Sequence, residues 1–198
     1  MKTIEFWIDY IDPASWVMHR RLRAATRTGG DLAPFEVNVM GREIRPPAAS
    51  PLDPASEAWR RYVASIRDVA GDDMDDYTAP RLLPHTRKAH ELAIHAADRD
   101  SRPAIDSAIF HAALVDGRDI GRVDVLVGLA EDVGLDRTET RAVLDVDRYT
   151  DDVVRMRETA ASQGVVGVPT MVCDGRALEG VRTLDEILAW LDGPLESN

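Results

Sequence analysis

The sequence predicts an α/β fold in which one central mixed sheet receives strands from both ends of the chain. Two observations predict it. Apolar residues recur at every second position near both ends, as in strands, but follow the 3.6-residue period of helices between Pro54 and Gly164. In addition, a helical segment joins the first two predicted strands, which favours a parallel pair with a right-handed crossover.

The N-terminal unit is a strand, a helix and a second strand. Residues 4–8 alternate between core-facing and outward-facing positions, which predicts a strand. Asp12 can cap the following helix with its carboxylate, and Pro13 suits the first helical position. We expect this helix to run to about Thr28. Alternation resumes over residues 35–39 and predicts the second strand.

The middle of the chain has helical spacing from Ser56 to about Gly164. Asp136 and Asp147 are expected to cap the last two helices of this segment. The first helix carries one apolar stripe, made of Trp59, Tyr62, Val63, Ile66 and Val69. We expect the inserted helices to form a lid over the helix start at Asp12.

The chain returns to strand spacing after Gly164. Residues 170–173 predict a strand, Asp174 and Gly175 a hairpin turn, and residues 177–179 a second strand before a helix that starts at Thr183. We therefore expect residues 1–50 and 165–198 to form one domain. Residues 55–150 would form a helical insertion subdomain, and residues 147–164 a long helix that links it back.

Composition narrows the classes of partner. The net charge of −11 and the pI of about 4.9 oppose binding to nucleic acid or to an anionic membrane. No apolar run is long enough to cross a bilayer. The single cysteine, Cys173, allows no intrachain disulfide, so nothing requires an oxidising compartment. We expect a cytoplasmic protein.

Four segments in order resemble the FrnE-type branch of the DsbA-like superfamily. They are Leu83 to His90, Ala108 to Ala113, Asp116 to Ile120, and Gly164 to Thr170, the last followed by Asp174-Gly175-Arg176. The resemblance covers nearly the whole chain. It implies a thioredoxin-like fold with an all-helical insertion, and the activity class of thiol–disulfide oxidoreductases.

The resemblance fails at the decisive position, because the two family cysteines fall on Asp12 and Ser15. Neither residue can form a disulfide, so the family's dithiol chemistry is not expected. Asp12 is interpreted first as a helix cap, and second as a carboxylate that faces the cleft and binds a cation or polarises a donor. Ser15 either bonds locally or donates to a ligand thiolate.

A sister group suggests glutathione. Kappa-class glutathione transferases and 2-hydroxychromene-2-carboxylate isomerases carry Ser-Pro-x-Ser in this turn, and Asp12-Pro13-Ala14-Ser15 differs at the leading serine. Their acidic residue that contacts glutathione would align with Arg182. Glutathione is the one cofactor that this resemblance implies, and no other cofactor is expected.

The proline loop is the second half of the expected site. The resemblance implies a cis bond before Pro169 and a ligand-binding cleft formed by Pro13, Ala14, Val168 and Pro169. In the resembled families, the backbone at the position of Val168 pairs with a bound peptide or with glutathione. That role needs only backbone atoms, so it does not depend on cysteines.

Two other chemistries are not expected. His90 and His95 are five residues apart, which turns the second imidazole by about 140° from the first on a helix, so no zinc site is predicted. Cys173 lies in an apolar strand and is expected in the core.

Three functions stay open. The first is an oxidoreductase-family protein that lacks the dithiol and keeps a cleft for a peptide or a small thiol. The second is a glutathione-dependent transferase or isomerase. The third is a non-catalytic binding module, for which a homodimer is a possible form.

Overall fold

The computed structural model describes residues 2–26, 30–32, 35–44 and 52–193. Four strands of this part form one sheet in the order β2-β1-β3-β4. They are β1 (Thr3–Ile8), β2 (Glu36–Gly41), β3 (Thr170–Cys173) and β4 (Arg176–Glu179). β1 pairs parallel with β2 and antiparallel with β3. The sheet is therefore mixed and takes strands from both ends of the chain, as predicted.

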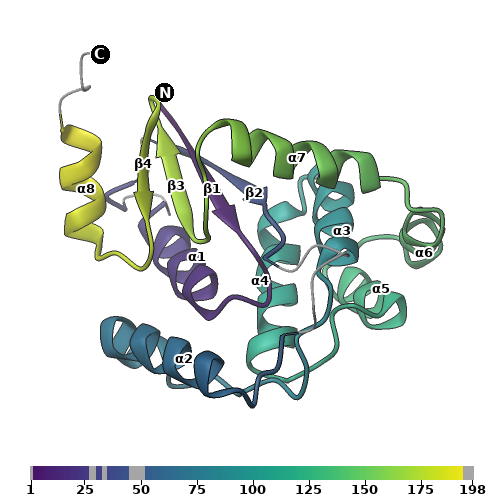
Figure 1. Cartoon of the computed structure of the whole chain (residues 1–198). Coiled ribbons are helices and arrows are strands. Elements are labelled where there is room, and N and C mark those ends of the chain that lie inside the picture. Colours follow the sequence, from purple (N-terminus) through teal and green to yellow (C-terminus); the bar gives the residue numbers. More distant parts are fainter. Residues whose placement is uncertain (1, 27–29, 33–34, 45–51, 194–198) are drawn as a thin grey trace.

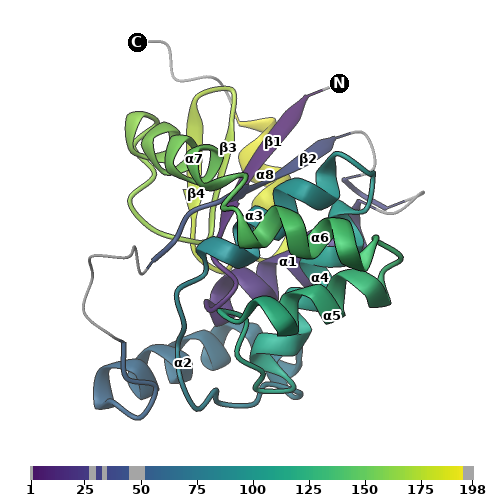
Figure 2. The same cartoon turned by 90° about the vertical axis from the view of Figure 1, so that its right-hand side faces the viewer.

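The helices surround this sheet (Figures 1 and 2). They are α1 (Pro13–Ala25), α2 (Glu57–Ala70), the 3-10 helix η1 (Gly71–Met74), α3 (Arg87–Ala97), α4 (Arg102–Leu114), α5 (Val123–Asp132), α6 (Arg137–Asp145), α7 (Thr150–Ser162) and α8 (Leu184–Asp192). Helix α2 lies below the start of α1 in Figure 1, whereas α3 to α6 form a group to one side of the sheet. None of the described helices is both long and apolar enough to cross a membrane.

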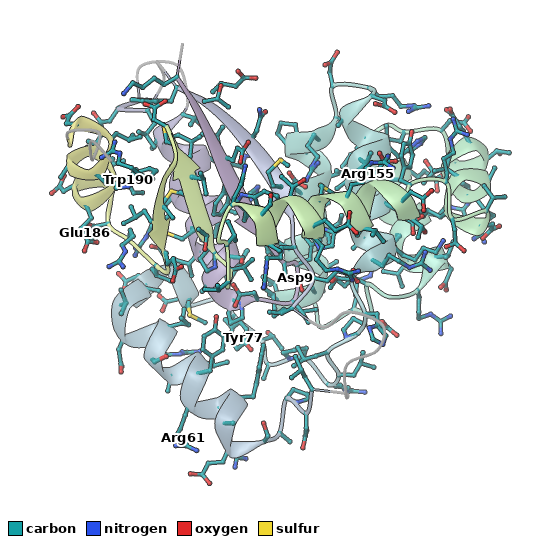
Figure 3. The ribbon with its side chains drawn as sticks, turned by 45° about the horizontal axis from the view of Figure 1, so that its top comes forward. Asp9, Arg61, Tyr77, Arg155, Glu186 and Trp190 are labelled. Carbon is teal, nitrogen blue, oxygen red and sulfur yellow. The ribbon has the colours of Figure 1, made fainter. Side chains whose placement is uncertain are left out.

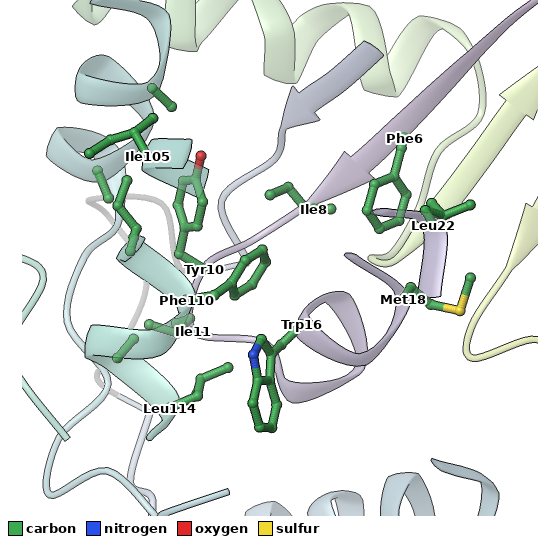
Figure 4. Close-up of a cluster of buried hydrophobic side chains, with 14 of the residues drawn as sticks. Phe6, Ile8, Tyr10, Ile11, Trp16, Met18, Leu22, Ile105, Phe110 and Leu114 are labelled. Atoms are coloured by element: carbon green, nitrogen blue, oxygen red, sulfur yellow. The ribbon is translucent and has the colours of Figure 1, made fainter. Parts of the chain in front are cut away.

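One core joins the sheet to the inserted helices. Phe6 of β1, Trp16 and Leu22 of α1, and Phe110 of α4 belong to a single buried cluster (Figure 4). The opposite face of β1 carries Trp7, which packs with residues of α7 and the segment after it. Because the insertion and the sheet share buried side chains, the helices hold the end of β1 and the start of α1 in place.

The local turn signals are confirmed. Asp174 and Gly175 have φ angles of 51° and 76°, the left-handed values that a two-residue type I′ hairpin needs, and they join β3 to β4. Asp12 caps α1, and Asp136 caps α6 through a bond from the Glu139 N–H.

Helix α1 ends at Ala25 with Thr26 as its C-cap, and the expected end at about Thr28 lies outside the described residues. Two other expectations about the helices were wrong. Asp147 does not cap α7, which begins at Thr150 after Tyr149. The carboxylate of Asp147 instead binds Arg87 and Lys88 of α3, at 2.7 and 2.6 Å. Val69 is 55% exposed, whereas the other four residues of the α2 stripe are half-buried.

The cap of α8 gives a direct test of local stability. Thr183 and Glu186 form a capping box, in which each side chain accepts a bond from the other's backbone N–H. Thr183→Ala is expected to lower the free energy of unfolding by about 1 kcal/mol in urea titrations. Thr159→Ala, which removes only a hydroxyl bond to a carbonyl one turn back, is the matched control. An equal loss in both variants would contradict the capping role.

Candidate functional site

A cavity of about 340 Å³ lies between the start of α1, helix α2 and the loop before β3. Its described lining residues are Asp12, Ile44, Leu52, Asp53, Ser56, Ala58, Trp59, Tyr62 and Val168. The fold thus brings Asp12 and Val168, which the sequence placed in one site, to the walls of the same cavity. Helix α2 supplies the opposite wall, whereas no described residue of helices α3 to α7 lines this cavity.

Asp12 is held by bonds from two helices. Its Oδ2 atom accepts the Ser15 N–H at 2.7 Å and the Ser15 hydroxyl at 2.6 Å. Its Oδ1 atom accepts the Tyr62 hydroxyl of α2 at 2.5 Å. Asp12 therefore both caps α1 and connects it to α2, and the two interpretations of this residue are compatible.

The surroundings of Asp12 bring the pKa of its carboxyl closer to neutral pH. Burial raises the pKa of Asp12 from 3.8 to about 6, against the opposing effect of the bonds from Ser15 and Tyr62. The charge of Asp9 raises this pKa further. Burial and the neighbouring carboxylate also raise the pKa of Tyr62, which stays a hydrogen-bond donor.

Other candidate residues lie behind the cavity wall. Pro13, Ala14, Ser15 and Pro169 are buried and are not among the described lining residues. Ser15 bonds locally to Asp12, and the Pro169 carbonyl accepts the Gly180 N–H at 2.9 Å. These four residues are not described as lining the cavity, whereas Val168 and Asp12, which is itself 1% exposed, line it.

The loop before β3 presents free backbone. The Val168–Pro169 peptide bond is cis, and Val168 is half-buried. Within the described ranges, neither the N–H nor the C=O of Val168 has a hydrogen-bond partner.

A buried pair that the sequence did not reveal supports the cavity from the rear. Asp9 follows β1 and lies near the middle of Figure 3. Its Oδ2 atom accepts the N–H of Ile44, a wall residue, at 2.6 Å, and its Oδ1 atom lies 3.4 Å from His90 Nε2. Gly41 leaves room for this imidazole, since a Cβ atom there would lie 2.5 Å from His90 Nδ1.

The histidines and the cysteine have other surroundings. His95 lies 3.4 Å from the Thr140 hydroxyl, away from the partner of His90. Among the described residues, no three His, Cys, Asp or Glu side chains are grouped to hold a metal ion. Cys173 is buried in the core, and burial, together with Asp174, raises the pKa of its thiol.

Among the larger cavities elsewhere, two share His19 and Arg23. They measure about 660 and 550 Å³ and border α1 and α4, away from Val168. Burial lowers the pKa of His19 from 6.5 to about 4, so the imidazole is neutral at physiological pH. Size alone does not identify the site, because neither cavity contains Asp12, Val168 or another candidate residue.

Known proteins resemble this chain along most of its length. The 2-hydroxychromene-2-carboxylate isomerase of Sphingobium xenophagum is 28% identical over 96% of this chain and 98% of its own. The structure of a probable DsbA oxidoreductase from Streptomyces coelicolor matches with a TM-score of 0.81 and 24% identity, over 100% of this chain and 94% of that one. The cytosolic disulfide reductase DsbM from Pseudomonas aeruginosa, solved with GSH, matches at 0.67 and 18% identity, over 96% and 97%.

The family model for the DSBA-like thioredoxin domain matches residues 3–192. This match covers the sheet, the insertion and the cavity together. The TM-score of 0.81 shows that the Streptomyces coelicolor protein shares the overall fold of this chain. The chain therefore belongs to the DsbA-like thioredoxin domain family.

Proposed function

We propose that this chain binds an extended peptide or a small thiol in the cavity between Asp12 and Val168, without dithiol chemistry. One observation carries the proposal: Asp12 lines the same cavity as Val168, whose N–H and C=O have no hydrogen-bond partner among the described residues. The single cysteine, Cys173, lies in the core and cannot cycle between an internal disulfide and a dithiol.

The geometry suits an extended backbone. A ligand beside residues 167–169 would accept from the Val168 N–H and donate to its C=O, as a strand does at a sheet edge. Ile44, Leu52 and Trp59 offer apolar surface for one ligand side chain. Asp12 and Tyr62 would lie at the polar end of that side chain.

The test is titration of the ¹⁵N-labelled chain with reduced glutathione and, separately, with a short acetylated and amidated peptide. Shifts of the amide signals of Ile44, Gly167 and Val168, saturating with ligand, would support the proposal. Shifts confined to the residues around His19, or no saturable shift with either ligand, would contradict it.

Dithiol activity gives a further prediction. We expect no catalysis of insulin reduction by dithiothreitol in the wild-type chain, because a lone thiol cannot complete the cycle. Asp12→Cys combined with Ser15→Cys, in a Cys173→Ser background, should bring exchange above that of either single cysteine variant. The helix start favours the thiolate at position 12. A double variant no more active than the single ones would show that the two positions do not have the family's geometry.

A second candidate is a glutathione-dependent isomerase. The pKa of Asp12 near 6 favours it, because a carboxyl that exchanges its proton near neutral pH suits general acid–base catalysis. The relative from Sphingobium xenophagum carries this activity in its name. Conversion of 2-hydroxychromene-2-carboxylate, followed in the ultraviolet with and without glutathione, tests it. If no conversion occurs in either condition, the isomerase candidate is rejected and only the binding function is left.

We also propose a cytoplasmic location. A chain with one buried cysteine gains nothing from an oxidising compartment, and one matched structure is described as a cytosolic reductase. Fractionation of cells that express the tagged chain tests the location.

A further inference from the structure

The charged residues in the described lining of the cavity are all acidic. Two of its described lining residues, Asp12 and Asp53, are acidic, and none is basic. Asp9 adds a third carboxyl behind Asp12, and its charge already acts on the Asp12 carboxyl. An anionic group in this cavity would meet like charges, whereas a cation would find them complementary.

The helix start does not offset this charge for an incoming anion. The N-terminus of α1 stabilises negative charge, but the carboxylate of Asp12 already occupies that position and accepts the Ser15 N–H. A ligand thiolate would have to lie beside this carboxylate. The site therefore disfavours a thiolate where a helix with an uncharged cap would favour it.

Helix α2 contributes two aromatic side chains to the cavity lining. Trp59 and Tyr62 of α2 both line the cavity, and their ring centroids lie 5.5 Å apart. The cation–aromatic contacts in the described part of the chain are Arg20 on Trp16 and Arg176 on Trp190, so Trp59 and Tyr62 have no cation of their own. Aromatic faces beside a carboxylate form a favourable site for an ammonium group on an apolar stem.

We propose that the cavity selects a lysine side chain from an extended peptide, with its ammonium group at Asp12 and its backbone on Val168. The stem of the lysine would lie along Ile44 and Trp59, and the free Val168 N–H and C=O would hold the neighbouring peptide unit. This inference rests on the proposed peptide-binding function and names the class of peptide.

Binding should depend on pH through Asp12. The groups that face its carboxyl are Ser15 of α1, Tyr62 of α2, and Asp9 and Tyr77. A pKa near 6 leaves Asp12 mostly ionised at pH 7.5 and mostly protonated at pH 5. If only the ionised form binds the ammonium group, the dissociation constant should rise about tenfold between these two pH values.

The experiment compares four capped pentapeptides that differ only at the centre: lysine, Nε-acetyllysine, leucine and glutamate. Calorimetry at pH 7.5 is expected to show the lysine peptide binding at least about tenfold more tightly than the other three, since a paired charge is worth about 1.4 kcal/mol or more when desolvated. Asp12→Asn should remove this preference and the pH dependence, because the amide oxygen keeps the acceptor without the charge. Asp174→Asn, in the distant hairpin, should keep both.

The outcomes separate the two proposals. Equal binding of the lysine and glutamate peptides at the cavity would overturn the lysine selectivity and leave peptide binding intact. No binding of any of the four peptides would overturn both. Thermal unfolding of Asp12→Asn checks that the variant is folded, and amide shifts at Ile44 and Val168 check that the bound peptide lies in the cavity.

Discussion

Asp106→Ala is expected to lower the free energy of unfolding by about 3–5 kcal/mol. Asp106 of α4 is fully buried and accepts Arg102 Nε at 2.8 and 3.0 Å and the Tyr10 hydroxyl at 2.5 Å. Removing this carboxylate leaves a nearly buried guanidinium without its counter-ion and a buried hydroxyl without its acceptor. Urea unfolding followed by circular dichroism at pH 7.5 measures the loss.

The matched control is another aspartate that binds an arginine, but at the surface. Asp124 pairs with Arg122 at 3.0 Å, and the two side chains are 57% and 62% exposed. Asp124→Ala should change the free energy of unfolding far less than Asp106→Ala does, because water screens the exposed pair. Similar losses in both variants would show that burial of the Asp106 pair does not determine its strength.

Asp12→Asn is expected to raise the free energy of unfolding by about 2–3 kcal/mol at pH 7.5, since the pKa of Asp12 is about 6 in the folded chain and 3.8 when the carboxyl is free in water. The folded state holds this proton more tightly than the unfolded state. The contribution of Asp12 is therefore most favourable below pH 3.8 and declines as the pH rises through 6. Asparagine stays neutral and keeps the cap.

The stability difference between Asp12→Asn and the wild type should vanish below about pH 3 and reach its full value above about pH 7. The stability of the variant must be compared with that of the wild type at each pH, because His19 also changes stability over an overlapping pH range. Its pKa of about 4 in the folded chain makes the stability of both proteins fall as the pH drops below 6.5. A difference that did not vary with pH would contradict the raised pKa. An Asp12→Asn variant that is more stable but no longer binds the lysine peptide would show that the wild-type carboxylate serves binding at the expense of stability.

Features that depend on a few neighbouring residues could be predicted from the sequence. Asp12 before Pro13 marked the start of α1, and Asp174-Gly175 marked the hairpin, because each sets backbone angles or bonds within its own turn. The change of apolar period located the insertion and hence the order of the elements. These rules are local, so they hold without knowledge of the packing.

Features that depend on how distant segments pack could not be predicted from the sequence. Asp147 has the sequence context of a cap, but Arg87 and Lys88 come close in the fold and bind it instead. Tyr62 belongs to an apolar stripe in the sequence, and its hydroxyl is the one group in that stripe that requires a polar partner. The sequence does not say which residue that partner is. Its bond to Asp12 joins residues far apart in the chain, as does the contact of Asp9 with His90.

A carboxyl at the start of α1 also decides what the site can sense. A thiol there would change state with peroxide, with disulfide exchange and with the glutathione pool. Asp12 has no oxidation chemistry of this kind, and proton exchange near pH 6 is its one change of state. The cavity should therefore behave identically in reduced and oxidised cells, and its occupancy should follow acidification instead.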